Sequence, residues 1–220
     1  MKSMFYWLGL IVSITVLISS CAKSSTDNSS SSSTTDSTTE LEGTWVSSCY
    51  QTSYSSELYD IQSITFTGSA FIFKWETHSD SSCANDFATW TDTYSSFSIG
   101  DETTLDNGST VRKISMKVDS FEALMQTEAA ATAYNSYGYC GYTDWAINTT
   151  KDYTGRTCNN ELQWSANTSV YGVYLLDGNC VTISNFSDSG YRFGDEHLRV
   201  IMTKQSATSC ADITPPTVSS

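Results

Sequence analysis

The sequence predicts a mainly β fold, an antiparallel up-and-down barrel of about eight strands with one short helix. The chain is rich in aromatic and β-branched residues, and its apolar side chains alternate at every second position in several runs. Glycine and polar breaks separate these runs. A closed barrel leaves no strand edge open to aggregation. A two-sheet β-sandwich is the alternative that the same pattern allows.

The first strands are the best marked. Residues 43–50 form the first of them, and residues 61–67 and 70–78 each place apolar side chains on one face. Gly68 and Ser69 lie between the last two runs, which therefore predict a hairpin. The remaining expected strands share this alternation and are residues 87–99, 111–118, 170–175, 180–184 and 198–204.

One segment departs from the strand pattern and predicts the helix. Asp119 is placed to cap a first turn, and Glu122 three residues later completes a capping-box arrangement. Phe121 and Met125 then share one helical face. We expect this helix to run to about Tyr134 and to lie over the sheet or close a barrel end.

The N-terminus has the pattern of an export signal. An early lysine, an apolar run over residues 5–18 and two serines precede Cys21. The apolar run is marginal for a membrane-spanning helix, which needs about 20 apolar residues. A plain cleaved signal peptide and an uncleaved anchor are the alternatives.

The end of this leader, Leu17-Ile18-Ser19-Ser20-Cys21, resembles the lipobox of bacterial lipoproteins. The resemblance implies that Cys21 becomes the N-terminus and carries acyl chains such as palmitate, which hold the protein on membrane lipid. Ala22, rather than aspartate, follows the cysteine, which implies sorting to the outer membrane of a Gram-negative cell envelope.

We expect four segments in the chain. Residues 1–20 are the lipoprotein signal peptide, and residues 21–40 are the lipidated N-terminus with a disordered Ser/Thr-rich tether, because no residue there seeds a core. Residues 41–212 form one β domain stabilised by disulfides, and residues 213–220 form a flexible tail.

The charge balance limits the partners. The chain has 24 acidic and 11 basic residues, for a net charge of −13. This excess argues against nucleic acid and anionic lipid headgroups as partners. It suits a soluble exposed domain or a cationic partner.

The cysteines predict disulfides. Six remain beside Cys21, an even number in an exported chain, and an oxidising compartment such as the periplasm favours three bonds. We expect sequential pairing, although spacing alone does not fix it. The expected bonds are Cys49–Cys83, Cys140–Cys158 and Cys180–Cys210.

We expect no metal and no cofactor. The chain has no CxxC motif, and His78 and His197 are not spaced with cysteines as a ligand set.

The first strand carries a second resemblance. Gly43-Thr44-Trp45 resembles the Gly-x-Trp of lipocalin-like (calycin) barrels, and residues 143–145, Thr-Asp-Trp, imperfectly match that family's second motif. The resemblance implies a structural pair at the barrel end, in which Trp45 packs under Arg199 or Lys204. The alternative is that Trp45 is an ordinary core aromatic residue.

An aromatic segment supplies the candidate contact residues for a ligand or partner. Tyr and Trp offer rigid area with a polar tip, and they dominate binding hot spots. The alternative is that these side chains only cap the barrel end. The candidates are Tyr137, Tyr139, Tyr142 and Trp145.

We identify no catalytic residue. The chain lacks a GxSxG motif, and only His78 and His197 offer a triad base. Asp92, Asp101 and Glu102 are better explained as turn acidity than as paired glycosidase carboxylates. An enzyme acting on envelope material is the remaining enzymatic alternative.

The sequence therefore predicts a membrane-anchored, non-enzymatic envelope lipoprotein that binds a small apolar ligand or has a structural role. The alternative is a protein-binding or inhibitor module for a cationic partner such as lysozyme, similar to small acidic disulfide-linked lipoproteins that inhibit lysozyme.

Overall fold

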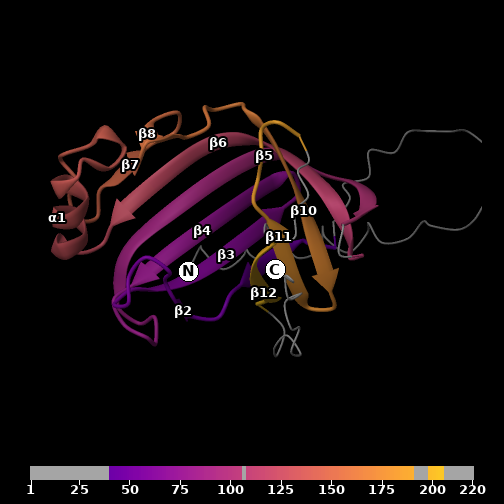
Figure 1. The fold of residues 1–220 in the computed structure, drawn as a ribbon, viewed down its shortest axis with the longest axis horizontal. Coiled ribbons are helices and arrows are strands. Elements are labelled where there is room, and N and C mark those ends of the chain that lie inside the picture. The colour runs from indigo at the N-terminus through magenta and orange to yellow at the C-terminus, as the bar shows by residue number, and fades with distance from the viewer. Residues whose placement is uncertain (1–39, 106–107, 191–197, 206–220) are drawn as a thin grey trace, which may run out of the picture. The chain divides into compact units, whose positions relative to one another are not determined.

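Eight antiparallel strands pair in chain order and close into a barrel (Figure 1). The ring closes because the first strand pairs with both the second and the last. The up-and-down barrel is thus confirmed, and the sandwich alternative is wrong. The strands are β1 (Gly43–Val46), β3 (Tyr59–Thr67), β4 (Ala70–His78), β5 (Asp86–Thr104), β6 (Thr110–Met125), β10 (Ser169–Asp177), β11 (Cys180–Ser184) and β12 (Leu198–Lys204).

The computed structural model describes residues 40–105, 108–190 and 198–205, and for residues 198–200 it describes the backbone alone. The expected signal peptide, the tether before Glu40, the lipidated Cys21 and the tail lie outside the described residues.

Smaller elements decorate the ring. The strand β2 (Tyr50–Gln51) pairs with β3, and β7 (Thr150–Asp152) pairs with β6. The strands β8 (Thr157–Cys158) and β9 (Glu161–Leu162) form a separate ribbon. The helix α1 (Glu128–Ser136) and the 3-10 turn η1 (Tyr139–Gly141) follow β6.

The strand period places the core inside the barrel. In β3 every second residue is buried, including Ile64 and Phe66, and the predicted hairpin with β4 is confirmed in register by the Phe66–Phe71 pair. The rings of these two phenylalanines lie 5.0 Å apart. Apolar side chains at alternate positions therefore point into the barrel and form its core, as the sequence pattern predicts.

The strands β5 and β6 are much longer than their neighbours and curve along the whole domain (Figure 1). Register shifts interrupt their pairing, between Thr93 and Tyr94 for example. Such bulges bend a strand and increase its twist. The curvature carries the end of β6 to α1.

The predicted start of the helix is wrong, because residues 119–125 belong to β6. Phe121, Ala123 and Met125 are buried while Glu122 is exposed, so this segment has the strand period of two. The apolar positions suit a helix as well, but pairing with β5 buries more of them. The helix begins at Glu128 rather than at Phe121.

Thr127, rather than Asp119, caps the helix. Its side-chain oxygen accepts a hydrogen bond from the amide of Ala130 at 3.1 Å, the usual N-cap contact. None of the helices in the described ranges is long and apolar enough to span a membrane.

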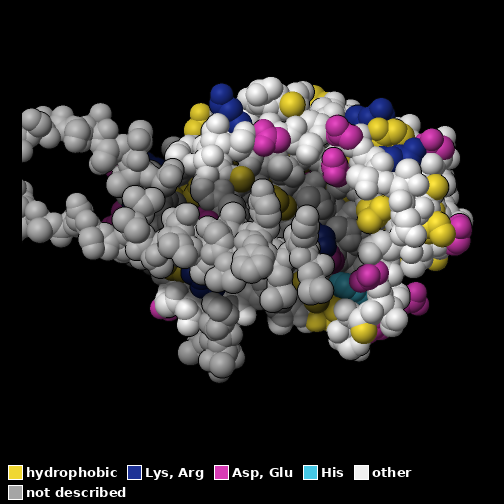
Figure 2. All heavy atoms as spheres, turned by 180° about the vertical axis from the view of Figure 1, so that it is seen from behind, with side chains coloured by type: hydrophobic (Ala, Val, Ile, Leu, Met, Phe, Trp, Pro, Cys, Tyr) yellow, Lys and Arg dark blue, Asp and Glu magenta, His cyan; other side chains and the backbone are white. Residues whose placement is uncertain are grey.

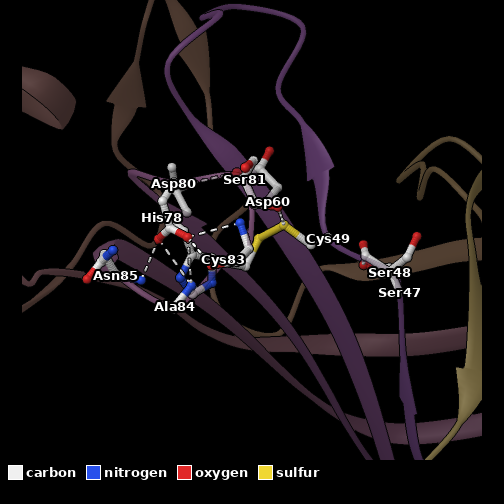
Figure 3. Close-up of a disulfide and its surroundings, with 12 residues drawn as sticks. Ser47, Ser48, Cys49, Asp60, His78, Asp80, Ser81, Cys83, Ala84 and Asn85 are labelled. Atoms are coloured by element: carbon white, nitrogen blue, oxygen red, sulfur yellow. Dashed lines mark hydrogen bonds between the residues drawn. A yellow bond between two sulfur atoms is a disulfide. The ribbon is translucent and has the colours of Figure 1, made fainter.

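Two of the three expected disulfides are confirmed, Cys49–Cys83 and Cys140–Cys158. Figure 3 shows the first, which ties the loop after β1 to the loop after β4. Cys180 is also disulfide-bonded, but its expected partner, Cys210, lies outside the described residues.

Trp45 lies at the seam where the barrel closes and is 1% exposed. Its indole Nε1 donates to the carbonyl of Leu41 at 2.8 Å. Of the two cations expected above it, Lys204 lies over the ring. The side chain of Arg199 is outside the described part of the chain.

Candidate functional site

Two adjoining cavities occupy the inside of the barrel. The inner cavity has a volume of about 490 Å³ and the outer one about 740 Å³. Phe73, Asp92, Glu161 and Gln163 line both, so the cavities adjoin at these residues, and we refer to the two together as the lumen. Each volume lies within the range of about 300–1,000 Å³ that is usual for small-molecule sites.

The inner cavity has walls from several strands of the ring. Phe71 on β4, Tyr94 on β5 and Phe121 on β6 form adjacent parts of it. The ring of Tyr94 lies 5.3 Å from that of Phe71 and 6.0 Å from that of Phe121. Alternation within each strand puts these rings on the same inner face.

The outer cavity is predominantly aromatic. Nine of its fifteen lining residues carry aromatic rings, whereas Leu58 and Ala133 are its aliphatic members. Rings of this kind combine large contact area with little flexibility. The nine are Tyr54, Phe73, Trp75, Phe87, Trp90, Tyr134, Tyr137, Tyr139 and Tyr153.

Four of these rings, each in contact with the next, form the wall nearest α1. Trp75 and Trp90 are paired across β4 and β5, with ring centroids 6.0 Å apart. Tyr134 on α1 lies 5.7 Å from Trp90 and 5.0 Å from Tyr139. Two strands, the helix and the turn η1 therefore build this wall together.

Asp92 brings a carboxylate to the junction of the two cavities. It lies on β5 between Trp90 and Tyr94, on the inward face of the strand. Its Oδ1 accepts a hydrogen bond from the hydroxyl of Tyr153 at 3.2 Å. A polar group placed within an apolar lumen is the arrangement that orients a bound ligand.

The tyrosines of the outer cavity remain protonated at neutral pH. Burial raises the pKa of Tyr153, and the negative charge of Asp92 raises that pKa further. Burial likewise raises the pKa of Tyr134 and of Tyr139. Their hydroxyl groups therefore offer hydrogen bonds and carry no charge.

The four aromatic residues predicted as ligand or partner contacts divide into two pairs. Tyr137 and Tyr139 line the outer cavity, and Tyr137 is 56% exposed. Tyr142 and Trp145 do not line it, and Trp145 is 3% exposed. The first pair is accessible from the lumen, while the second pair packs behind it.

This second pair holds the segment after α1 in place. The Asn135 side chain donates to the Trp145 carbonyl at 2.9 Å and accepts from the Trp145 amide at 2.6 Å. The guanidinium of Arg156 lies 4.0 Å from the Tyr142 ring centroid, and the ammonium of Lys151 lies 4.5 Å from it. These contacts fix the loop that supplies Tyr139.

His78 is buried near the Cys49–Cys83 disulfide (Figure 3). Its Nδ1 lies 3.3 Å from Asp86 Oδ1, without the geometry of a hydrogen bond. The neighbouring Asp80 accepts from the hydroxyl of Ser82 and from the amides of Asn85 and Ala84, and these contacts hold the pKa of Asp80 well below its usual range. Asp80 therefore serves the loop. His197 lies outside the described residues.

The other acidic candidates do not form a pair. Asp92 lies in the lumen, whereas Asp101 and Glu102 are exposed on the outer part of β5. Within the described ranges, no group of three or more His, Cys, Asp or Glu side chains is placed to hold a metal ion.

The sequence did not predict that Trp90, Asp92 and Tyr134 line the lumen, and the interpretation of Asp92 as turn acidity is wrong, because Asp92 lies within β5. A signal for Asp92 was available, because it alternates with Trp90 and Tyr94 and so occupies the inward face of a strand. Tyr134 had no such signal, since its position depends on how α1 folds back over the barrel end.

Comparisons with protein-family models and with curated proteins find no match to this chain.

Proposed function

We propose that this protein is a non-enzymatic lipoprotein of the bacterial cell envelope that binds a small, largely apolar ligand inside its barrel. The lipid anchor at Cys21 holds it to the membrane, and the acidic domain extends from that anchor on the Ser/Thr-rich tether. The lipocalin-like first strand and the barrel ring suit such a carrier.

The observation that carries the ligand half of this proposal is the pair of adjoining cavities with aromatic side chains in their walls. The inner and outer cavities meet at Phe73 and Asp92. A barrel of eight strands is just wide enough either to be filled by side chains or to hold one small ligand. Cavities of about 490 and 740 Å³ leave room for the ligand.

A lumen filled by mutation tests this half. Ala133 on α1 lines the outer cavity, whereas the adjacent Thr132 is exposed and does not. Ala133→Trp should weaken binding of an apolar fluorescent probe at least about tenfold, and the matched Thr132→Trp should leave it unchanged. Equal probe binding by both variants would place the probe outside the lumen.

Native mass spectrometry of protein isolated from the envelope identifies the natural cargo. A small molecule that is lost on denaturation supports the carrier. A clean apo mass together with failure to bind the probe favours the structural role instead.

The anchor is tested separately from the ligand. Incorporation of labelled palmitate should disappear in Cys21→Ala, and the protein should leave the membrane fraction. Retention of label in that variant would contradict the lipoprotein assignment.

A second candidate function is binding of a cationic protein at the mouth of the barrel. Tyr54 and Tyr137 line the outer cavity and are 57% and 56% exposed, and the chain has a net charge of −13. Figure 2 shows hydrophobic and acidic side chains together on the end of the domain that carries α1. Salt-sensitive binding to lysozyme, lost in Tyr137→Ser, would support it, and binding that does not respond to salt would contradict it.

A further inference from the structure

We infer that the ligand carries a cationic group, an organic ammonium on an apolar body, whose charge lies in the outer cavity between the aromatic rings and Asp92. This inference rests on the proposed ligand-binding function and names the chemical class of the ligand. The aromatic wall, the charges of the lumen and the position of Asp92 support it.

The aromatic wall is suited to a cation. Ring faces carry the negative end of a quadrupole, and an ammonium within about 6 Å of a ring centroid is attracted to it, most strongly by Trp. Trp75, Trp90, Tyr134 and Tyr139 lie in contact around one part of the outer cavity, with centroid separations between 5.0 and 6.0 Å. An ammonium seated there reaches several rings at once.

Among the described residues, the charged side chains that line the lumen are all acidic. Asp92 and Glu161 line both cavities, and no lysine, arginine or histidine is among the described residues that line either. A carboxylate-headed ligand such as a fatty acid would meet repulsion and find no described cation to pair with.

Asp92 is held in position to receive the cation. The hydroxyl of Tyr153 donates to Oδ1 at 3.2 Å, which orients the carboxylate at the junction of the cavities. A carboxylate offers about four acceptor sites, so Asp92 can accept from a ligand in addition to its partners within the protein. The inner cavity lies beyond it, and its apolar members, among them Phe71, Ile183 and Met202, would contact the hydrocarbon part of the ligand.

Three probes with the same octyl chain and different heads test the inference. They are octyltrimethylammonium, octanol and octanoate, titrated by calorimetry into the purified full-length protein. We expect the ammonium to bind about tenfold more tightly than the alcohol, and the carboxylate to bind least.

Two variants on the same strand locate the charge effect. Asp92→Asn removes the lumen carboxylate, and Asp101→Asn removes an exposed carboxylate from β5 at no lumen position. We expect Asp92→Asn to weaken the ammonium about tenfold and to leave octanol unchanged, while Asp101→Asn alters neither. Circular dichroism and the melting temperature establish that both variants are folded. If a variant does not fold, the three probes titrated into the unmodified protein still test the inference.

The outcomes separate the inference from the function on which it rests. If octanol and octyltrimethylammonium bind equally and Ala133→Trp abolishes both, the carrier function stands and the cationic ligand is wrong. Preference for octanoate, or equal effects of Asp92→Asn and Asp101→Asn, also overturns the inference. If none of the probes binds, the carrier function itself fails.

Discussion

The ammonium of Lys204 lies 5.2 Å from the centroid of the Trp45 ring, and these two residues are partners in the register of β12 and β1. The last strand of the ring thus places a cation on the aromatic residue of the first strand. Because the barrel closes at this pair of strands, the contact joins the two ends of the chain's meander. A residue pair separated by most of the domain therefore helps to fix the closure.

We expect Trp45 to matter for stability far more than the cation above it. Trp45→Ala leaves a cavity in the core and should lower the free energy of unfolding by about 3–5 kcal/mol. Lys204→Met keeps the aliphatic stem and removes the charge, so this substitution should lower the free energy of unfolding by only about 0.5–1 kcal/mol. Urea unfolding measures both. A Lys204→Met loss as large as that of Trp45→Ala would show that the ion, rather than burial, dominates at the seam.

Most strands could be predicted from the sequence because their buried side chains recur at every second residue. The hairpin of β3 and β4 and the final strand from Leu198 to Lys204 were predicted closely. The segment from Asp119 to Met125 was not, because its apolar residues fit both a helical face and a strand face. Long-range pairing of Phe121 with Asp92 on β5 decides between them, and the local sequence does not contain that information.

The candidate site was only partly predictable for a related reason. Tyr137 and Tyr139 were singled out as aromatic residues in a loop, and they do line the outer cavity. Trp145 belongs to the same sequence cluster but is buried behind it. Loop composition gives the kind of side chain, whereas the direction of each one depends on contacts such as the Asn135 clamp and the Cys140–Cys158 bond.

The Cys140–Cys158 disulfide should contribute substantially to stability. It closes a loop with a sequence separation of 18 residues, for which restriction of the unfolded chain predicts about 3 kcal/mol. Replacing both cysteines with serine should lower the denaturant midpoint accordingly and loosen the loop that presents Tyr139. Equilibrium unfolding tests the first effect and hydrogen exchange of the loop amides tests the second. An unchanged midpoint would contradict the prediction.

The N-cap of α1 offers a smaller and more local test. Thr127→Ala removes the acceptor for the Ala130 amide and should destabilise the protein by about 1 kcal/mol. Thr127→Ser keeps the oxygen and should have little effect. Because α1 carries Tyr134 into the outer cavity, exchange of the helix amides should speed up in Thr127→Ala more than in the serine variant. Equal exchange in both would mean that packing alone holds the helix.

Glu40 makes stability depend on pH in one direction. Its carboxylate accepts hydrogen bonds from the hydroxyl of Tyr174 and from Arg112 Nη1, the latter at 3.0 Å. The Tyr174 hydrogen bond, followed by that of Arg112 and its charge, holds the pKa of Glu40 below its ordinary value of 4.5. A carboxyl with a lowered folded-state pKa stabilises the fold above its unfolded pKa and loses this contribution as the pH falls through the folded one.

Glu40→Gln should therefore be less stable than the unmodified protein at pH 7, and the difference should shrink below the ordinary glutamate pKa. Unfolding midpoints measured across this range test the sign. Glu57→Gln, at an exposed position, is the matched control and should show no such trend. A difference between Glu40→Gln and the unmodified protein that grows on acidification would refute the assignment.

Gly172 on β10 is required because the ring of Phe186 occupies the space beside it. A Cβ at position 172 would lie 2.8 Å from Phe186 Cδ1 and 3.1 Å from Ser184 Oγ. Phe186 lines the inner cavity and packs 5.6 Å from Tyr94.

Gly172→Ala should therefore lower the free energy of unfolding by about 1–3 kcal/mol by displacing the Phe186 ring. In a Phe186→Ala background the closest contact is gone and only the Ser184 hydroxyl must shift slightly, so the same substitution should cost much less. A double-mutant cycle by urea unfolding measures this coupling. The same loss in both backgrounds would mean that the Phe186 ring is not the reason for glycine, and that the cause lies with Ser184, whose hydroxyl accepts from the Val173 amide at 2.9 Å.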